Sequence, residues 1–375
     1  MSKLVLVDGA KGHTGTFLLK EILETKPEWN IVATDLPSNR RDELMAKEKI
    51  FSSRFKYMTE ILENKRIKFI PADLTQKSTL IPLFQGKRYD IIFHVASLYD
   101  YFADLELLRR INVEGIQNLL EIVYETQDFN KLRFMHWSTC GVYGEPKYQK
   151  NKKGFSLPAD ETVPYSPPNN YSVSKMEQEL VLKDYINKYK LKSTIIRPAP
   201  IMGPYQIYGV FHIMQIVNKS GFGPGIHIYP KRKRLAMPLI HVEDLVRAAI
   251  FLAENEQSIG EAYNLVLDTC FQEDFLEYLA DLLNVDYFNL PIWWPFYKIF
   301  SKFLYWLNKR KNRKAQKLNS RPIVDLSMTG YTTHQYLFSN KKIKDLGFEF
   351  KFSDYKSATN DTIQWYLRNK WLESE

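Results

Sequence analysis

A tyrosine and a lysine four residues apart are the pair in this sequence best suited to moving a proton. Tyr171 and Lys175 fall within residues 170–182, where apolar residues recur at helical spacing, so both side chains should project from one helix face. An isolated tyrosine has a pKa of about 10, which a nearby ammonium lowers by favouring the phenolate. The pair is a candidate acid–base couple, although the same spacing is also common on ordinary helix surfaces.

A glycine-rich loop near the N-terminus could hold a dinucleotide. Gly9, Gly12 and Gly15 follow the apolar run of residues 4–7 and precede a helical pattern. Glycine permits a tight turn and lets the backbone approach a pyrophosphate, which the N-terminus of the next helix would bind. Asp35 ends the next apolar run, where a ribose hydroxyl needs an acceptor. The arrangement predicts a nicotinamide dinucleotide site.

Strand-like and helical patterns alternate through the first 140 residues. Apolar runs of strand length occupy residues 4–7, 31–34, 67–70, 91–94 and 132–137, with helical spacing at 105–123 and room for an extra helix in 38–66. The alternation predicts an α/β fold: a Rossmann, doubly wound parallel sheet with helices on both faces. Beyond residue 197 the regular alternation of strand-like and helical patterns ends. Residues 203–238 are rich in Gly, Pro and aromatic residues and predict a substrate region built from loops, and residues 285–330 also lack strand–helix rhythm.

The expected organisation is therefore an NAD(P)-binding Rossmann domain and a smaller, interleaved C-terminal substrate region. The first comprises residues 1–200, with part of 236–270 returning to it; the second comprises 201–235 and 271–375, including an aromatic and basic segment at 291–317. Two cysteines are too few for a disulfide framework, which favours a cytoplasmic protein. The apolar N-terminal run is too short for a signal peptide, and no run of about 18 apolar residues could span a bilayer.

The spacing of the glycine loop resembles that of the extended short-chain dehydrogenase/reductase family, and further motifs of that family follow in order over residues 3–370. They are Asp73-Leu74, His94–Ser97, Asn112–Gly115, Ser138–Gly144, Tyr171–Lys175, Arg197-Pro198, Gly203-Pro204, His241–Asp244, Lys344–Gly347 and Thr362–Tyr366. The resemblance implies an NAD(P)-dependent oxidoreductase with Tyr171, Lys175 and Thr139 as catalytic residues. Ser138 is the rival of Thr139, and Cys140 is expected to be a packing residue.

The same resemblance assigns the cofactor site and no metal site. The expected cofactor-binding residues are Gly9, Gly12, His13, Thr14, Gly15, Asp35, Asp73, Leu74, Val95, Ala96, Ser97, Asn112, Lys175 and Pro198. Asp35 would repel a 2′-phosphate and favours NAD. Lys11, Arg40 and Arg41 could each pair with that phosphate, which leaves NADP as the alternative.

Three departures from the nucleotide-sugar members of the family favour an apolar substrate. Cys140 and Gly141 stand where sugar 4,6-dehydratases carry the acid and base for water elimination. Pro200 and Met237 replace an Asn and an Arg that contact a substrate diphosphate. The leading hypothesis is an enzyme that interconverts a secondary alcohol and ketone on a lipid- or steroid-like molecule. The alternative is a nucleotide-sugar epimerase or reductase; intact catalytic residues disfavour a non-catalytic cofactor sensor.

An aromatic segment followed by a basic run also favours an apolar substrate over a nucleotide sugar. Residues 291–307 resemble the C-terminal stretch of 3β-hydroxysteroid dehydrogenase-like enzymes. A helix from Phe296 would carry Lys298, Ser301, Lys302, Tyr305 and Lys309 on one stripe, and it is too short to span a bilayer. Residues 293–317 are expected either to lie on an anionic membrane surface or to cover the substrate pocket and small-domain core. The net charge of +9, with basic clusters at 231–234 and 309–317, also suits a plain solvated surface. No recognition motif indicates nucleic acid, and a homodimer is left open.

Overall fold

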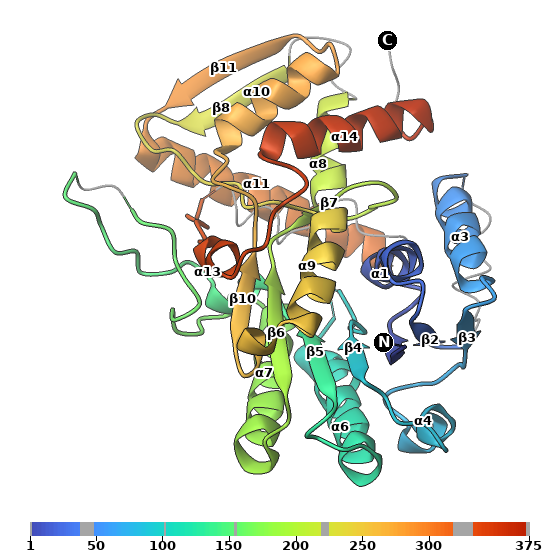
Figure 1. The fold of residues 1–375 in the computed structure, drawn as a ribbon. Coiled ribbons are helices and arrows are strands. Elements are labelled where there is room, and N and C mark those ends of the chain that lie inside the picture. Colours follow the sequence, from blue (N-terminus) through green and yellow to red (C-terminus); the bar gives the residue numbers. More distant parts are fainter. Residues whose placement is uncertain are drawn as a thin grey trace.

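The computed structural model describes residues 2–37, 49–100, 103–153, 156–218, 225–317 and 333–372. Its centre is a seven-stranded parallel sheet with strand order β10-β6-β5-β4-β1-β2-β3 (Figure 1). The strands are β1 (Leu4–Asp8), β2 (Asn30–Thr34), β3 (Ile67–Phe69), β4 (Ile91–His94), β5 (Arg133–Trp137), β6 (Ser193–Pro198) and β10 (Ala262–Leu265). The first five match the predicted runs to within one residue at each end. The reversal of strand order between β1 and β4 confirms the doubly wound Rossmann fold.

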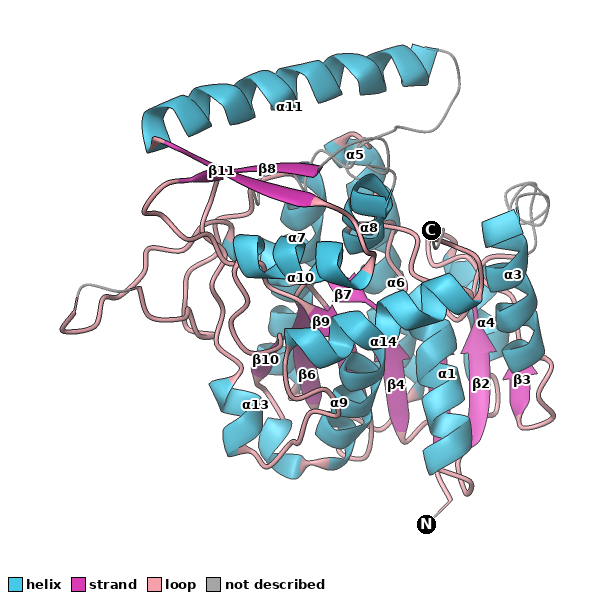
Figure 2. Ribbon diagram, turned by 90° about the horizontal axis from the view of Figure 1, so that it is seen from above, coloured by secondary structure: helices cyan, strands magenta, loops and turns pink. Residues whose placement is uncertain are grey.

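Helices cover both faces of this sheet (Figure 2). They include α1 (His13–Thr25), α4 (Lys77–Phe84), α6 (Glu114–Thr126), α7 (Asn170–Tyr189) and α9 (Val242–Glu254). Successive residues of a strand point to opposite faces. In β1, Val5 and Val7 accordingly pack in one hydrophobic cluster with α1 and α9, whereas Leu6 packs in the other with α4, α6 and α7. This two-sided burial explains why the strands read as continuous apolar runs.

Two predicted helices are refined by the structure. The helical pattern at 105–123 becomes α5 (Leu105–Leu108), a π-helical turn over Arg109–Val113, and then α6. A π turn adds a residue to the helix ladder and often occurs at functional sites; here it contains Asn112. The extra helix expected in 38–66 is α3 (Lys49–Leu62). Arg40 and Arg41, named as partners for a 2′-phosphate, lie outside the described residues.

The prediction that 203–238 is built from loops was wrong in part. The segment contains α8 (Val210–Asn218) and β8 (Gly225–Pro230), and β8 pairs in parallel with β11 (Tyr287–Ile292) as a separate ribbon. The partner strand is distant in sequence, and both strands contain a proline, which a strand tolerates at an edge. Local patterning could therefore not reveal this pairing. Residues 285–330, expected to lack strand–helix rhythm, likewise contain β11 and then α11 (Trp294–Lys317).

The remaining elements of the described chain lie mostly in its C-terminal half. They are β7 (Ile201–Met202), β9 (Ile240–His241), α10 (Gln272–Leu282), α13 (Lys341–Asp345), α14 (Tyr355–Arg368) and 3-10 turns at Cys140–Tyr143 and Glu256–Ser258. Tyr366 of α14 is buried and donates its hydroxyl proton towards the carbonyls of Gly203 and Gln206. This contact fastens the C-terminal helix to the loop that follows β7.

Candidate active site

The predicted site residues converge on one edge of the main sheet. Gly9, Asp35, Val95, Ser138 and Pro198 stand at or directly after the carboxyl ends of β1, β2, β4, β5 and β6. Because the strands are parallel, these ends share one edge, where ligands bind in open α/β sheets. The fold therefore brings together residues that are far apart in the sequence.

The glycine loop is so tightly folded that larger side chains do not fit. Gly9 has a φ of +64°, and a Cβ there would lie 2.8 Å from the Ala96 backbone. A Cβ on Gly15 would lie 2.1 Å from the Gly9 carbonyl oxygen, and the Gly12 N–H donates to that same oxygen at 2.9 Å. The loop leads directly into the N-terminus of α1, which includes His13 and Thr14. Such a cradle fits a dinucleotide pyrophosphate.

Asp35 joins the end of β2 to this loop. Its carboxylate accepts hydrogen bonds from the Lys11 N–H at 2.8 Å and the Leu36 N–H at 2.7 Å. Burial raises the pKa of the carboxyl, although the two N–H groups favour its charged form. The Lys11 ammonium donates to the Leu36 carbonyl at 2.9 Å. Asp35 thus lies beside the loop, where a carboxylate could accept from a ribose diol.

Asp8 positions the backbone that follows β4, a role that the sequence analysis did not predict. Its carboxylate accepts from the N–H groups of Val95 and Ala96, at 2.7 Å each, and contacts His94 Nδ1 at 2.6 Å. These bonds fix the chain at the end of β4, against which Gly9 packs. An acid directly before a glycine loop was the available signal, but its partners belong to another strand.

Some predicted cofactor residues use their side chains to hold other protein groups. Asn112 accepts from the Leu98 N–H at 2.7 Å and donates to the Ser174 hydroxyl at 3.0 Å, so it positions the segment after β4. By contrast, the hydroxyl of Ser97 is buried and has no hydrogen-bond partner among the described residues. A buried hydroxyl of this kind calls for an additional partner, which fits a bound cofactor.

The remaining predicted residues frame the cofactor region. The Asp73 carboxylate accepts from the Thr75 N–H at 2.9 Å and so shapes its own turn. Leu74 packs against Gly115, where a Cβ would approach the Leu74 side chain to 3.2 Å. The His13 ring lies 2.8 Å from the Pro204 carbonyl oxygen, and burial lowers the pKa of His13 to about 3, so the neutral ring donates there.

Tyr171 and Lys175 lie on the first turns of α7, and both are buried. The Asn169 side chain caps this helix by accepting from the Ser172 N–H at 2.9 Å, which fixes where the helix begins. Burial raises the pKa of Tyr171 and lowers the pKa of Lys175 to about 7, with Glu179 and Asp8 partly opposing the second shift. Burial thus outweighs the lowering of the Tyr171 pKa that was expected from Lys175. Strongly shifted pKa values in a buried pair are nevertheless typical of functional sites.

Thr139 and Ser138, the two candidates for the catalytic hydroxyl, differ in burial and in hydrogen bonding. Ser138 is buried and donates its hydroxyl proton to Glu179. Thr139 is partly exposed, and its oxygen caps the following turn by accepting from the Gly141 N–H at 3.0 Å, a contact that does not use the hydroxyl proton. Cys140 is buried and donates to the Arg197 carbonyl at 3.1 Å, and burial raises the pKa of its thiol. Cys140 thus packs, as expected.

A buried ion pair supports this part of the site. Arg197 on β6 and Glu179 on α7 meet through two hydrogen bonds, at 2.9 and 2.6 Å. Burial opposes ionisation of Glu179, but the Arg197 guanidinium holds the pKa of that carboxyl below its ordinary value. The pair ties the helix that carries Tyr171 and Lys175 to the sheet edge.

The sequence analysis did not predict that Tyr99 packs against Tyr171 or that Tyr208 packs against Tyr99. The Tyr99 ring packs edge-on against Tyr171, with centroids 5.1 Å apart, and Tyr208 lies 5.8 Å from Tyr99. Tyr99 is partly exposed. Tyr99 comes from the chain after β4 and Tyr208 from the chain after β7, so only the tertiary structure brings the two rings together near Tyr171.

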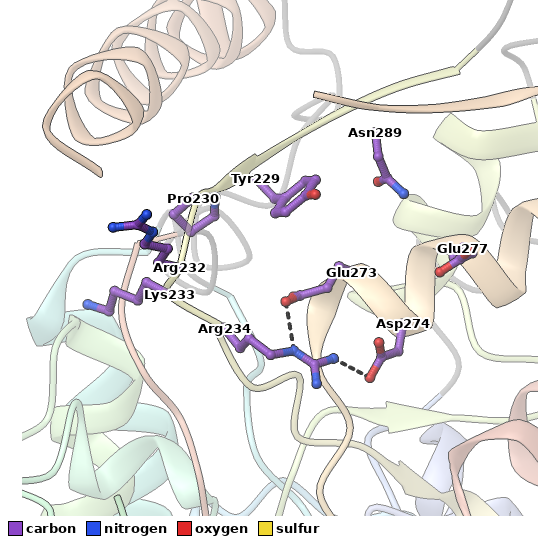
Figure 3. A pocket seen from close by; sticks show the side chains of 9 residues that line it. All are labelled: Tyr229, Pro230, Arg232, Lys233, Arg234, Glu273, Asp274, Glu277 and Asn289. Carbon is purple, nitrogen blue, oxygen red and sulfur yellow. Dashed lines mark hydrogen bonds and ion pairs between the residues drawn. The ribbon is translucent and has the colours of Figure 1, made fainter. Parts of the chain in front are cut away.

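The basic cluster at 231–234 lies elsewhere, around a surface hollow between β8, β11 and α10 (Figure 3). Arg234 pairs with Glu273 at 2.9 Å and with Asp274 at 2.5 Å. Lys233 places its ammonium 3.8 Å from the centroid of a Trp294 ring. The hollow is lined by both signs of charge and contains none of the predicted catalytic residues.

The fold and the site define a dinucleotide-dependent enzyme of the Rossmann type. The chain belongs to the NAD dependent epimerase/dehydratase family, whose model matches residues 5–265. It is therefore an NAD-dependent enzyme, which confirms the resemblance to the extended short-chain dehydrogenase/reductases and the choice of NAD. In the part of the chain that the structure describes, no group of three or more His, Cys, Asp or Glu could hold a metal ion.

Individual relatives are distant. The chain is 24% identical to dTDP-D-glucose 4,6-dehydratase of Bos taurus, covering 100% of this chain and 92% of that protein. A 3beta-hydroxysteroid-dehydrogenase/decarboxylase of Arabidopsis thaliana is 28% identical over 39% of this chain and 31% of its own length. Among solved structures, an NAD complex of dTDP-glucose 4,6-dehydratase from Bacillus anthracis matches with a TM-score of 0.69 and 18% identity, covering 99% of this chain and 98% of that one.

Asp35→Ala is expected to narrow the preference of the protein for NAD(H) over NADP(H), because the variant loses both the ribose acceptor and the charge that repels a 2′-phosphate. Calorimetric titration with the two reduced cofactors measures the change. Asp184→Ala, which removes an exposed carboxylate from α7, serves as the control. A wild type that prefers NADP(H) would instead assign the dominant role to Lys11.

Proposed function

We propose that the chain interconverts a secondary alcohol and a ketone by hydride transfer, with Tyr171 as the acid–base residue. The observation that carries this proposal is the placement of Tyr171 and Lys175, buried one helical turn apart, at the sheet edge that also holds the glycine loop. NAD, when bound, supplies or accepts the hydride. The side chains of this protein hold the substrate and move the proton.

Each catalytic residue has a distinct role in this mechanism. Tyr171 donates a proton to the substrate oxygen during reduction and accepts it during oxidation. A charged Lys175 stabilises the phenolate and so lowers the barrier to that transfer, and Asp8 and Glu179 favour the charged lysine. The Thr139 hydroxyl donates to the substrate oxygen and holds it near Tyr171.

The glycine loop, Asp35 and the segment at 95–97 would hold the cofactor. Ser97 contributes the buried hydroxyl that is left for a partner, and the open N-terminus of α1 contributes backbone donors. Asp8 and Asn112 act through the backbone that they position. Residues 201–235 and 271–375 supply the substrate contacts in this proposal.

An apolar, lipid- or steroid-like substrate is the leading substrate class. The Tyr99 ring packs against Tyr171, and the Tyr208 ring packs against Tyr99. Met237, at the position of a diphosphate-binding arginine in the sugar branch, is buried in the core. Water elimination is disfavoured because Cys140 is buried with a raised pKa, and Gly141 has no side chain to serve as acid or base.

A nucleotide sugar is the second candidate substrate. Relatives named as dTDP-glucose 4,6-dehydratases cover nearly the whole chain, whereas the hydroxysteroid relative covers a smaller part. Because the elimination residues differ, this candidate is an epimerase or reductase rather than a dehydratase.

One substrate panel distinguishes the candidates. The protein is incubated with NAD and either 3β-hydroxysteroids, long-chain secondary alcohols, UDP-glucose or dTDP-glucose. Products are followed by NADH formation, by mass spectrometry and, for the nucleotide sugars, by chromatographic separation of epimers, which differ from the substrate in neither mass nor oxidation state. We expect NADH formation with an apolar alcohol and no loss of water from dTDP-glucose. Turnover restricted to UDP-glucose would select the second candidate, and dehydration of dTDP-glucose would refute both assignments.

A further inference from the structure

Helix α11 presents its apolar side chains to solvent. Trp293, just before the helix, and Phe296, Ile299, Phe303 and Trp306 within it are each more than half exposed. Their spacing of three or four residues places the helical members on one face. The opposite face contains Tyr297, Ser301 and Asn312, which are buried. Several of the largest apolar side chains of this helix therefore face solvent, unlike those of an ordinary surface helix.

The position of α11 leaves that apolar face accessible. Figure 2 shows the helix as an outlying rod beside the β8–β11 ribbon, with the rest of the protein on one side of it. The ribbon also exposes Ile226, Phe288 and Leu290. A collection of exposed large apolar side chains on this scale is typical of an interaction site.

The charge of α11 limits what can cover this face. The helix contains eight lysine and arginine residues and no aspartate or glutamate. All eight are exposed, and six of them lie in its C-terminal half, at 309–317. Trp306 and Arg310 lie together, with the guanidinium 5.5 Å from the ring centroid. Aromatic and aliphatic side chains beside clustered cations match a lipid interface that bears negative headgroups.

A second copy of this chain is a poorer occupant. Pairing two α11 helices would bring another eight cations close to the first eight, without carboxylates on either helix to compensate them. An anionic bilayer offers both an apolar layer and the opposite charge. Within the ranges that the structure describes, no helix is long and apolar enough to cross a membrane, so the contact would be along the surface.

We propose that the face formed by Trp293, Phe296, Ile299, Phe303 and Trp306, together with the basic end of α11, docks on an anionic membrane surface. The test is co-sedimentation of the full chain with phosphatidylcholine vesicles, with and without phosphatidylserine. Binding is expected with phosphatidylserine at low salt, and it should weaken strongly at about 1 M salt, where the Debye length falls to about 3 Å.

Matched variants separate the two contributions. Neutralising Arg310, Arg313 and Lys314 to Gln should weaken vesicle binding on the order of 100-fold, since each cation near the surface contributes roughly fivefold. The control variant neutralises three exposed lysines elsewhere: Lys56, Lys131 and Lys341.

The apolar contribution has its own pair of variants. Phe303→Ser with Trp306→Ser should reduce binding at least tenfold, whereas Ile81→Ser with Leu180→Ser, exposed residues of α4 and α7, should not. All these side chains are exposed, so NAD affinity and the unfolding midpoint should stay unchanged in every variant. These readouts do not depend on turnover, so failure of the proposed reaction would not affect the result.

Three results would overturn the proposal. The first is protein that remains in the supernatant with phosphatidylserine vesicles at low salt. The second is vesicle binding that the α11 variants leave at the wild-type level. The third is a stable dimer that the Phe303 and Trp306 substitutions dissociate, without vesicle binding, which would identify a second copy as the occupant.

Discussion

Replacing Tyr171 by phenylalanine is expected to reduce kcat by about 10²-fold or more while leaving NAD affinity near the wild-type value. The substitution removes one hydroxyl and keeps the ring that packs against Tyr99. The measurement is steady-state turnover of whichever substrate the panel identifies, with cofactor affinity determined separately by titration.

Two further variants make this result specific. Tyr185→Phe, which removes a hydroxyl from the same helix away from the sheet edge, should retain activity. Lys175→Met should lose turnover as Tyr171→Phe does, since a charged lysine no longer stabilises the phenolate. Near-normal turnover by Tyr171→Phe would contradict the assignment of the acid–base residue.

Replacing Arg197 by methionine is expected to lower the free energy of unfolding by about 3–5 kcal/mol. Among the described residues, the buried Glu179 carboxylate would keep as an ion-pair partner only the partly exposed Lys183 ammonium, 4.0 Å away. A loss of this size is a large part of the roughly 5–15 kcal/mol that stabilises a typical protein. Urea unfolding at neutral pH measures it. Glu179→Gln in the same background should recover part of the loss, since a neutral amide removes the buried charge. Its oxygen can accept from one of the two hydroxyls, Ser138 or Tyr165, and its NH2 group can donate to the other.

The matched control is Arg109→Met, which breaks the exposed pair that Arg109 makes with Glu177, also on α7. Its effect on unfolding should be far smaller, because solvent screens exposed pairs. The folded-state pKa of Glu179 lies below its ordinary value. The wild-type contribution is therefore complete above the unfolded-state pKa and is lost as pH falls through the folded-state value. Equal effects of the two arginine substitutions would show that burial does not strengthen the inner pair.

The sequence alone determined five of the seven strands of the main sheet, the cofactor loop and the candidate catalytic pair. The five N-terminal strands are continuous apolar runs because both faces of the sheet are buried, so their signal is local. The loop formed by Gly9, Gly12 and Gly15 can be recognised from the sequence because the tight backbone contact that these glycines permit spans only a few residues. Tyr171 and Lys175 are readable for the same reason, since one helical turn fixes their common face.

Contacts between distant segments were decided by the tertiary structure. Asp8 meets the backbone at Val95 and Ala96 across neighbouring strands, and Ser138 differs from Thr139 only because Glu179 of α7 lies beside it. The pairing of β8 with β11 likewise depends on a partner far along the chain.

The orientation of α11 also could not be predicted from the sequence. Its sequence carries aromatic and aliphatic residues around much of the helix, so periodicity could not decide which side is buried. Contact with the rest of the fold selected the side with Tyr297 and Ser301, and left Phe296, Ile299 and Phe303 exposed. Local sequence fixes a helix and its faces, but only the surfaces available for packing decide which face turns inward.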